Sequence, residues 1–205
     1  HLQPKPNQIF IDGTVGQGGH AEMILSRILP DSRQYTSRLL AIDRDSQNLA
    51  TSRARLSRFG EAVTFVHDSY ANVGKHVRAL AFPPAHGILL DLGFASSQID
   101  DPSRGFSFRA DGPLDMRYDL TGGQTATDLV NELDVEELAC LFRLYGEEKA
   151  ARPIAQAIVK ERRGTPIDRT SVLAELVARV VRQTGPIHPA TRVFQALRIA
   201  VNDEF

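Results

Sequence analysis

Short apolar runs alternate with amphipathic stretches along the first hundred residues of the chain. The apolar runs are rich in Ile, Leu and Val, and they predict strands over residues 9–11, 38–43, 62–67 and 87–92. Between these runs, apolar residues recur at helical spacing and predict helices over residues 22–29, 46–59 and 70–80. Strands that alternate with helices predict a parallel sheet with right-handed crossovers, and therefore an α/β fold.

The pattern changes after residue 100. Residues 101–123 are rich in Gly, Pro, Asp and Arg and show no period, which is typical of a long functional or disordered loop. Beyond this loop the pattern predicts helices over residues 126–131, 135–145, 148–162, 170–183 and 190–201. We therefore divide the chain into an α/β core over residues 1–101, a loop over residues 102–124 and a helical subdomain over residues 125–205.

The chain has 205 residues, of which 42% are hydrophobic and 24% charged, an ordinary globular composition. Its net charge is only −1, but the charges are segregated. Residues 111–148 hold ten acidic and two basic side chains, whereas residues 149–198 hold ten basic and three acidic ones. The second block could therefore dock on a polyanion such as a nucleic acid. Alternatively, the two blocks face each other or the solvent.

Cys140 is the only cysteine, so no disulfide can form within the chain, which fits a reducing compartment. It lies in an apolar helical segment, and we expect it to be buried in the core. No apolar run approaches the length of about 18 residues that indicates a membrane span, and no signal peptide is visible. We expect a cytoplasmic protein that does not enter a membrane, with the mitochondrial matrix or another organelle as the alternative.

The stretch from Ile9 to His20 carries the first candidate chemistry. An apolar strand leads to Asp12, four glycines follow within seven residues, and a helical pattern then begins. A strand, a glycine-rich turn and a helix form a cradle for an anionic or nucleoside-bearing cofactor. The alternative is a tight turn between strand and helix that binds nothing.

The residue types in this stretch argue against phosphate binding. A Walker loop needs Gly-Lys-Ser/Thr at the start of the helix, where this chain has Gly18-Gly19-His20. The glycine spacing also differs from the G-x-G-x-x-G of dinucleotide enzymes. Asp12 would repel a pyrophosphate, whereas it could hold an amino group. These facts favour a cofactor with a cationic amino-acid end and an adenosine end, namely S-adenosylmethionine.

Three acids, Asp12, Asp43 and Asp91, are expected at the ends of strands. Because ligands bind beyond the carboxyl ends of strands in an open parallel sheet, these acids would line one crevice. Asp43 could accept hydrogen bonds from both ribose hydroxyls of an adenosine, or it could instead cap the next helix. Asp91-Leu92-Gly93-Phe94 loosely matches the Asp/Asn/Ser-x-x-aromatic tetrapeptide of amino-group methyltransferases. There an acceptor binds the protons of the amine and an aromatic ring stacks on the base, although Phe94 could simply pack.

Longer stretches resemble one family. They are IDGTVGQGGH, LLAIDRD, GILLDLGFASSQIDDPSRGFSFRADGPLDMR, YGEEKAARPIAQAIV and HPATRVFQALRIAVNDE, and they run from about residue 9 to the last residue. The chain resembles the bacterial small-subunit ribosomal RNA cytosine-N4 methyltransferases (RsmH/MraW), which have mitochondrial relatives. This resemblance implies a Rossmann-like S-adenosylmethionine-dependent methyltransferase sheet with an inserted all-helical subdomain. It also implies that the sheet here lacks its last strands, because they follow later in the family.

The resemblance implies an activity and a partner. The activity is S-adenosylmethionine-dependent methylation of N4 of a cytidine in the decoding region of small-subunit ribosomal RNA, as free RNA or in the assembled subunit. Two rival functions stay open: a non-catalytic RNA-binding factor of ribosome assembly, and an amino-methyltransferase that acts on DNA or a small molecule. A homodimer also stays open. No metal is expected, because the histidines are scattered without ligand spacing.

The family motifs also imply roles for individual residues. The implied cofactor contacts are Gly18, Gly19, His20, Asp43, Tyr70, Asp91 and Gln98, with Asp12 at the methionine end. Asp91 is the first candidate to accept a hydrogen bond or proton from the amine, and Asp115 is the second unless it pairs with Arg117 or Arg109. The candidate RNA contacts are Arg104, Arg109, Arg117, Lys149, Arg152, Lys160, Arg162, Arg163, Arg192 and Arg198.

Overall fold

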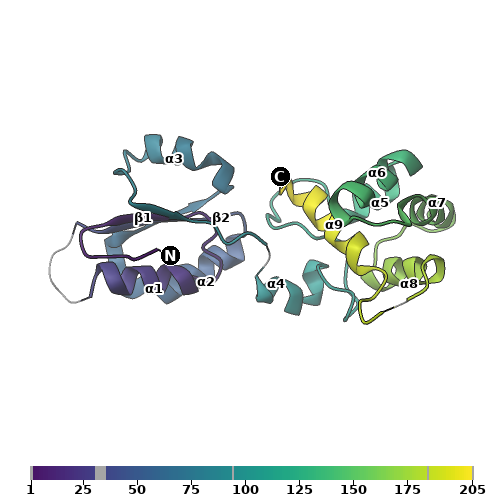
Figure 1. Cartoon of the computed structure of the whole chain (residues 1–205), viewed down its shortest axis with the longest axis horizontal. Helices are drawn as coiled ribbons and strands as arrows, with labels where there is room; N and C mark the ends of the chain where they lie inside the picture. Colours follow the sequence, from purple (N-terminus) through teal and green to yellow (C-terminus); the bar gives the residue numbers. More distant parts are fainter. Residues whose placement is uncertain (1, 31–35, 94, 184, 205) are drawn as a thin grey trace. The chain divides into compact units, whose positions relative to one another are not determined.

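In a computed structural model, which describes residues 2–30, 36–93, 95–183 and 185–204, residues 1–95 form one unit and residues 96–205 another. The first unit contains a four-stranded parallel sheet in the order β3-β2-β1-β4 (Figure 1). Its strands are β1 (Ile9–Asp12), β2 (Arg38–Asp43), β3 (Val63–His67) and β4 (Gly87–Leu89). The predicted parallel α/β fold is therefore confirmed.

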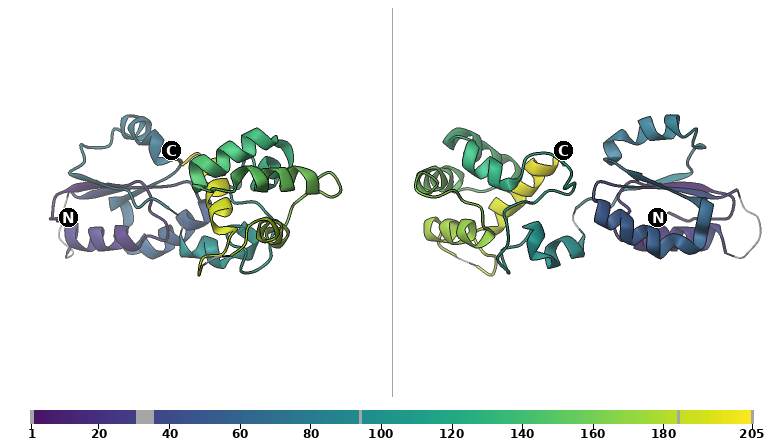
Figure 2. Two further views of the ribbon diagram at one scale, coloured as in Figure 1. Left: turned by 45° about the vertical axis from the view of Figure 1, so that its right-hand side comes forward. Right: turned by 180° about the vertical axis from the view of Figure 1, so that it is seen from behind.

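Helices cover both faces of this sheet, and Figures 1 and 2 show α1 and α2 on one face and α3 on the other. They are α1 (Gly19–Ile28), α2 (Ser46–Leu56) and α3 (Val73–Ala79). The 3-10 turn η1 (Ser57–Ala62) follows α2, and the 3-10 turn η2 (Tyr70–Asn72) precedes α3. Because successive strand residues point to opposite faces, Phe10 and Leu39 are buried in the cluster that α1 and α2 share. Ile11 and Leu40 belong to the cluster on the α3 side.

Several elements of this unit differ from their predicted bounds, and α1 and β4 are two of them. Helix α1 begins at Gly19, three residues before its predicted start, and β4 ends at Leu89 rather than at residue 92. The end of β4 follows from its partner, because Leu89 pairs with Asp12, the last residue of β1. Beyond that point the described part of the sheet offers Leu90 no neighbour in the ladder, and its side chain is exposed.

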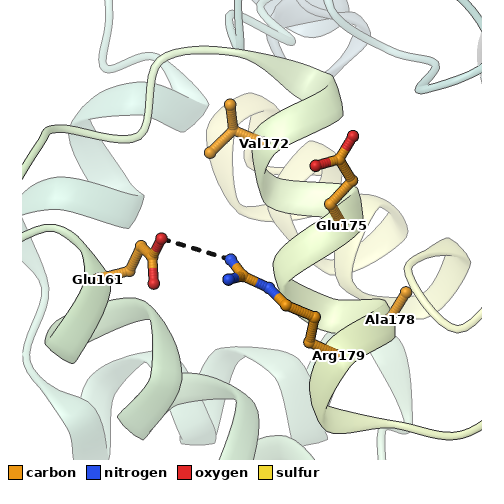
Figure 3. A pocket seen from close by; sticks show the side chains of 5 residues that line it. All are labelled: Glu161, Val172, Glu175, Ala178 and Arg179. Atoms are coloured by element: carbon orange, nitrogen blue, oxygen red, sulfur yellow. Dashed lines mark hydrogen bonds and ion pairs between the residues drawn. The ribbon is translucent and has the colours of Figure 1, made fainter.

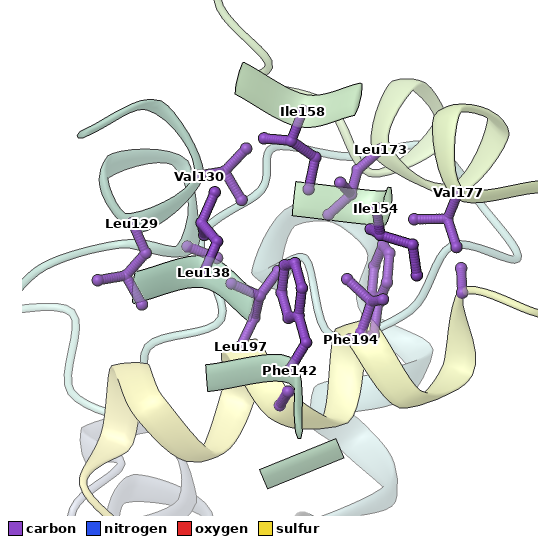
Figure 4. Close-up of a cluster of buried hydrophobic side chains, with 14 of the residues drawn as sticks. Leu129, Val130, Leu138, Phe142, Ile154, Ile158, Leu173, Val177, Phe194 and Leu197 are labelled. Atoms are coloured by element: carbon purple, nitrogen blue, oxygen red, sulfur yellow. The ribbon is translucent and has the colours of Figure 1, made fainter. Parts of the chain in front are cut away.

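The second unit is helical (Figure 1). Its elements are α4 (Ser96–Asp100), η3 (Pro102–Arg104), α5 (Ala126–Glu132), α6 (Val135–Gly146), α7 (Ala151–Glu161), α8 (Thr170–Val180) and α9 (Thr191–Asn202). The side chains of Phe142, Ile154 and Leu197 are fully buried and meet in one core that α5 to α9 share (Figure 4). The predicted helical second half is therefore confirmed, although the short helix α4 was not predicted.

Local side-chain contacts set the ends of these helices. Thr125 and Asp128 form a capping box that starts α5, and Asp134 and Glu137 form another that starts α6. Helix α7 begins at Ala151, not at the predicted residue 148. The reason is that the Glu148 carboxylate accepts a hydrogen bond from the Ala150 backbone N–H at 2.8 Å, ahead of the helix.

The loop that the sequence placed between two parts of the chain lies within the second unit. Leu114 and Met116 are fully buried in the helical core. The backbone of Leu114 is also held on both sides, because its N–H donates to the carbonyl of Asp168 and its carbonyl accepts from the N–H of Thr127. The border between the two units therefore falls after residue 95, and the loop is part of the helical unit.

The prediction that Cys140 is buried is wrong, because its side chain is exposed. The neighbouring residues Leu138, Ala139, Leu141 and Phe142 are the buried ones in α6. Apolar residues on both sides of Cys140 in the sequence face the core, whereas Cys140 falls on the outer side of the helix.

Candidate cofactor site

Glycines shape the loop between β1 and α1. Gly16 and Gly18 have φ values of 51° and 84°, in the left-handed region that favours glycine. At Gly13 the reason is space, because a Cβ there would lie 2.6 Å from Leu90 Cδ2 and 3.0 Å from Tyr70 Cβ. The absence of a side chain lets two other segments approach the end of β1. Since these restraints arise inside the protein, the glycines alone do not distinguish a ligand cradle from a tight turn.

Asp12 ends β1 with a side chain that is fully buried. Its Oδ1 accepts a hydrogen bond from the Thr14 backbone N–H at 3.2 Å, whereas Oδ2 is buried and has no hydrogen-bond partner among the residues that the structure describes. Burial raises the pKa of Asp12 to about 6, against the lowering effects of the Thr14 N–H and of His20. An unpaired, buried carboxylate oxygen is costly, and a cationic donor would relieve that cost.

Asp43 ends β2 and holds the glycine loop. Its Oδ2 accepts from the Gly16 N–H at 2.7 Å and its Oδ1 from the Asp45 N–H at 2.8 Å. Burial raises the pKa of Asp43, and these two N–H groups oppose that rise. The cap of α2 is Asp45, which accepts from the backbone of Gln47 and Asn48. The alternative that Asp43 serves as the helix cap is therefore excluded.

Asp91 lies two residues beyond the end of β4 and is tied to the glycine loop. Its backbone N–H donates to Thr14 Oγ1 at 2.7 Å. Its side chain is 66% exposed, and Oδ2 lies 3.6 Å from Nδ1 of His20 in the first turn of α1. The carboxylate of Asp91 is therefore exposed enough for a substrate to reach it.

The structure thus brings most of the predicted cofactor residues to one edge of the first sheet. The contacts described above link the ends of β1, β2 and β4 with the loop and with Tyr70, the first residue of η2. The set gathered there is Asp12, Gly18, Gly19, His20, Asp43, Tyr70 and Asp91. Phe94, the candidate for stacking on a base, lies outside the described residues.

Two residues of this edge were missed in the sequence. Thr14 connects the carboxylate of Asp12 to the backbone of Asp91 through its N–H and its hydroxyl. Asp68 directly follows β3, and its N–H donates to the Asp43 carbonyl at 3.1 Å. A signal existed for Asp68, because the same pattern of strand and acid had singled out Asp12 and Asp43.

Two other residues that were predicted from the sequence belong to the second unit. They are Gln98, a predicted cofactor contact, and Asp115, the second candidate proton acceptor. Gln98 is buried in α4. Asp115 is held by Arg117, whose Nε and Nη2 lie 2.9 and 2.8 Å from its two oxygens. Burial would raise the pKa of Asp115, but the hydrogen bonds from Arg117 outweigh it and lower the pKa. The alternative that Asp115 is a loop acid paired with Arg117 is therefore confirmed, and Arg109 is not its partner.

Arg104 does not fit its predicted role as an RNA contact. It is only 3% exposed, and its Nη2 donates to the carbonyls of Arg117 at 2.9 Å and of Tyr118 at 3.1 Å. A guanidinium used in this way ties two parts of the loop together and cannot reach a phosphate. This correction follows from burial, which the charge pattern of the sequence does not report.

The remaining nominated cations divide into two groups. Five of them already have a polar partner. Arg117, Arg152 and Arg198 pair with the carboxylates of Asp115, Glu136 and Glu204, in that order, whereas Arg162 and Arg192 donate to the backbone carbonyls of Val130 and Glu147. The side chains of the others are exposed and have no hydrogen-bond or ion-pair partner among the described residues, and these are Arg109, Lys149, Lys160 and Arg163. Only the second group is available to phosphates without the loss of an existing contact.

A pocket on the helical unit involves none of the nominated residues (Figure 3). Val172, Glu175, Ala178 and Arg179 of α8 line it, and Glu161 at the end of α7 closes one side through an ion pair with Arg179 at 3.4 Å. Its walls carry charges of both signs beside the apolar side chains of Val172 and Ala178, and it lies in a different unit from the glycine loop.

Within the described ranges, no group of three or more His, Cys, Asp or Glu side chains is placed to hold a metal ion. Over the same ranges, no helix is both long and apolar enough to cross a membrane.

Comparison with known proteins assigns a family. The MraW methylase family model matches residues 1–205. Ribosomal RNA small subunit methyltransferase H of Syntrophotalea carbinolica is 48% identical over 206 residues, which cover 99% of this chain and 64% of that protein. The proteins of the same name from Thermomicrobium roseum and Sorangium cellulosum are 47% and 44% identical over 99% of this chain, and over 61% and 63% of their own lengths.

The chain thus spans less than two thirds of the length of these relatives. Among solved structures, an rRNA methylase from Streptococcus thermophilus matches 44% of this chain and 48% of its own, with 24% identity and a TM-score of 0.35.

Proposed function

Since the chain belongs to the MraW methylase family, we propose that it uses S-adenosylmethionine to methylate N4 of a cytidine in the decoding region of small-subunit ribosomal RNA. The relatives support the substrate class, because they are called ribosomal RNA small subunit methyltransferases. The observation that carries the cofactor assignment is the buried Asp12 carboxylate, whose Oδ2 has no hydrogen-bond partner in the described part of the chain.

The residues at this edge fit S-adenosylmethionine, which would supply an electrophilic methyl group when bound. A cationic amino group suits the unpaired oxygen of Asp12. The carboxylate of Asp43 accepts from the backbone N–H groups of Gly16 and Asp45 and from the side chain of Asn48. Because an ionised carboxylate offers about four acceptor positions, it can also accept from a ribose hydroxyl. The ring of Tyr70 offers a face on which adenine could stack. In this assignment Gly18, Gly19 and His20 at the start of α1 bring the backbone close to the ligand.

Asp91 is the better of the two candidate acceptors for the amine. Its carboxylate is exposed beside the glycine loop, whereas the carboxylate of Asp115 is held by Arg117 and has a lowered pKa. A lowered pKa makes a carboxylate a weaker proton acceptor. We therefore assign Asp91 the role of accepting a hydrogen bond, and then the proton, from N4 of the cytidine. Asp115 keeps a structural role in the loop.

The exposed cations of the helical unit supply a surface for the RNA. Arg109, Lys149, Lys160 and Arg163 carry no competing contact among the described residues. Lys149, Lys160 and Arg163 belong to the basic block over residues 149–198, and Arg109 lies in the long loop. Phosphate contacts of this kind orient an RNA without reading its sequence. A substrate in the small ribosomal subunit would place the protein where ribosomes assemble, which is the bacterial cytoplasm or an organelle matrix.

Two measurements test the proposal. Calorimetry with S-adenosylhomocysteine tests the cofactor site, and transfer of a labelled methyl group tests the reaction on decoding-region RNA and on small ribosomal subunits. We expect binding, followed by N4-methylcytidine in the nucleosides of the product. Cofactor binding without transfer, on any RNA or subunit and in a protein of the relatives' length, would instead indicate a non-catalytic assembly factor. Equal transfer to DNA or free cytidine would overturn the ribosomal assignment.

A further inference from the structure

An acid that the proposed function does not use lies at the same edge of the sheet. Asp68 follows β3, and its N–H donates to the carbonyl of Asp43 at 3.1 Å. This bond adds one more rung beyond the pairing of Asp43 with His67 at the ends of β2 and β3. The backbone of Asp68 is therefore fixed relative to Asp43.

The carboxylate of Asp68 gathers three groups from the next eight residues of the chain. Its Oδ1 accepts from the Ser69 N–H at 2.7 Å and from Asn72 Nδ2 at 2.9 Å, and its Oδ2 lies 2.6 Å from His76 Nε2. Burial alone would raise the pKa of Asp68, but the bonds from Asn72, His76 and Ser69 outweigh it and lower the pKa to about 2. The carboxylate is therefore charged throughout the neutral range.

The residues that form these bonds lie before and after Tyr70 in the sequence. Ser69 precedes it, and Asn72 closes the turn η2 by donating its N–H to the Ser69 carbonyl at 3.0 Å. His76 lies one turn into α3. On its other side Tyr70 meets the glycine loop, because a Cβ on Gly13 would lie only 3.0 Å from the Cβ of Tyr70. Because the Cβ of Tyr70 lies this close to the glycine loop, a small movement of η2 would change how Tyr70 packs against the loop.

We infer that the Asp68–His76 pair is a positioning device that holds η2 so that Tyr70 faces the cofactor site. The inference rests on the proposed function, since it assumes that Tyr70 contacts the cofactor. Asp68 is itself occupied by protein donors, so its role is to set the position of Tyr70. His76 belongs to α3, so its contact with Asp68 connects the turn η2 to that helix, whose Val73 and Val77 pack on the sheet.

The first test measures the affinity of the chain for S-adenosylhomocysteine by calorimetry, with the melting temperature recorded for every variant. We expect His76→Ala to bind about tenfold more weakly, because hydrogen bonds to charged groups are among the stronger ones. His76→Gln, which keeps a donor, should recover most of the affinity. Lys75→Ala is the matched control, because Lys75 is exposed on the same helix, and it should bind like the wild type.

A double-mutant cycle with Tyr70→Ala separates positioning from a general loss of structure. If His76 acts through Tyr70, adding His76→Ala to Tyr70→Ala should weaken binding no further. An equal loss in both backgrounds, or an unchanged affinity of His76→Ala alone, would overturn the inference while the cofactor site stands. If the wild-type chain binds no S-adenosylhomocysteine, the proposed cofactor site falls and the positioning role falls with it.

Discussion

The buried carboxylate of Asp12 lowers the stability of the folded protein, but it leaves one oxygen available to a ligand. Its carboxylate is fully buried, and one of its oxygens finds no hydrogen bond among the described residues. Charge in such a place is normally removed or paired. Its raised pKa means that the folded protein holds the proton of Asp12 more tightly than the unfolded chain does. The free energy of unfolding must therefore depend on pH through this residue.

We expect Asp12→Asn to become more stable relative to the wild type as the pH rises. The folded pKa of about 6 lies above the ordinary value of 3.8, so the destabilising contribution of Asp12 is absent below about pH 4 and complete above about pH 6. The shift corresponds to about 2–3 kcal/mol in the free energy of unfolding. Urea denaturation of both proteins at pH 4, 5, 6 and 7 measures it. A difference that does not change with pH would contradict the assignment.

Asp43 acts at the same scale by holding the loop. Asp43→Ala removes the acceptor for the N–H groups of Gly16 and Asp45, and we expect it to weaken S-adenosylhomocysteine binding by about 1–3 kcal/mol. Asp45→Ala is the matched control, because Asp45 caps α2. Loss of that cap should lower stability by about 1 kcal/mol with little effect on affinity. Equal affinity of both variants, measured by calorimetry, would show that Asp43 does not shape the cofactor site.

At the scale of elements, the long loop of the second unit behaves as part of the core. Its buried Leu114 and Met116 and the internal bonds of Arg104 replace regular secondary structure. Asn202 of α9 adds another connection, since its Nδ2 donates to the Met116 carbonyl at 2.7 Å. A loop that is held in this way can present exposed side chains such as Arg109 in a defined place.

Gly112 tests how tightly this loop is packed. A Cβ at Gly112 would lie 1.8 Å from the backbone oxygen of Pro102, so the backbone would have to move to accept a side chain. We expect Gly112→Ala to destabilise the protein by about 1–3 kcal/mol, measured as a shift of the urea midpoint. Gly122→Ala is the control, because a Cβ there meets nothing within 4 Å. Equal stability of the two variants would mean that the loop adapts freely.

At the scale of the whole molecule, the chain contains two units whose hydrophobic clusters are separate. One set of buried residues surrounds the sheet, and another is formed by α5 to α9 together with the long loop. The candidate cofactor residues lie mainly in the first unit, and the exposed cations lie in the second. Separate cores of this kind are expected to fold separately.

We expect residues 96–205 to fold without residues 1–95. Expressed alone, this unit should show helical circular dichroism and one cooperative thermal transition, because its core draws on no residue of the first unit. Ile88 in the edge strand β4 is exposed, and so are Leu90 and Leu92 just beyond it. Residues 1–95 alone should therefore be less soluble than residues 96–205. A non-cooperative melt of residues 96–205 would contradict this prediction.

The helical unit should also account for the salt dependence of RNA binding. Alanine at Lys149, Lys160 and Arg163 together should reduce the slope of log K against log salt by about 2–3, because each lost phosphate contact removes about one. Arg38→Ala is the control, because Arg38 starts β2 at the opposite end from the candidate site. Filter binding across a salt series measures the slopes. An unaltered slope in the triple variant would remove these three residues from the RNA surface.

The sequence by itself determined in which order strands and helices follow one another along the chain, because the spacing of hydrophobic residues depends only on neighbouring residues. It also singled out Asp12 and Asp43, because strand-end acids in a parallel sheet must share an edge. Only the tertiary structure decided what each charge contacts. It showed that the Asp43 carboxylate accepts from the N–H groups of Gly16 and Asp45, and that Arg104 is buried.

The reason is that a side chain's partner can lie far along the chain. The N–H of Asp91 reaches Thr14, which is 77 residues away, and no pattern in the sequence predicts that contact. Whether a side chain is buried also depends on contacts with distant parts of the chain. Leu114 lies in a stretch without period yet joins the core, and Cys140 lies in an apolar stretch yet faces outward. Periodicity predicts the elements, whereas packing decides which of their side chains remain available for chemistry.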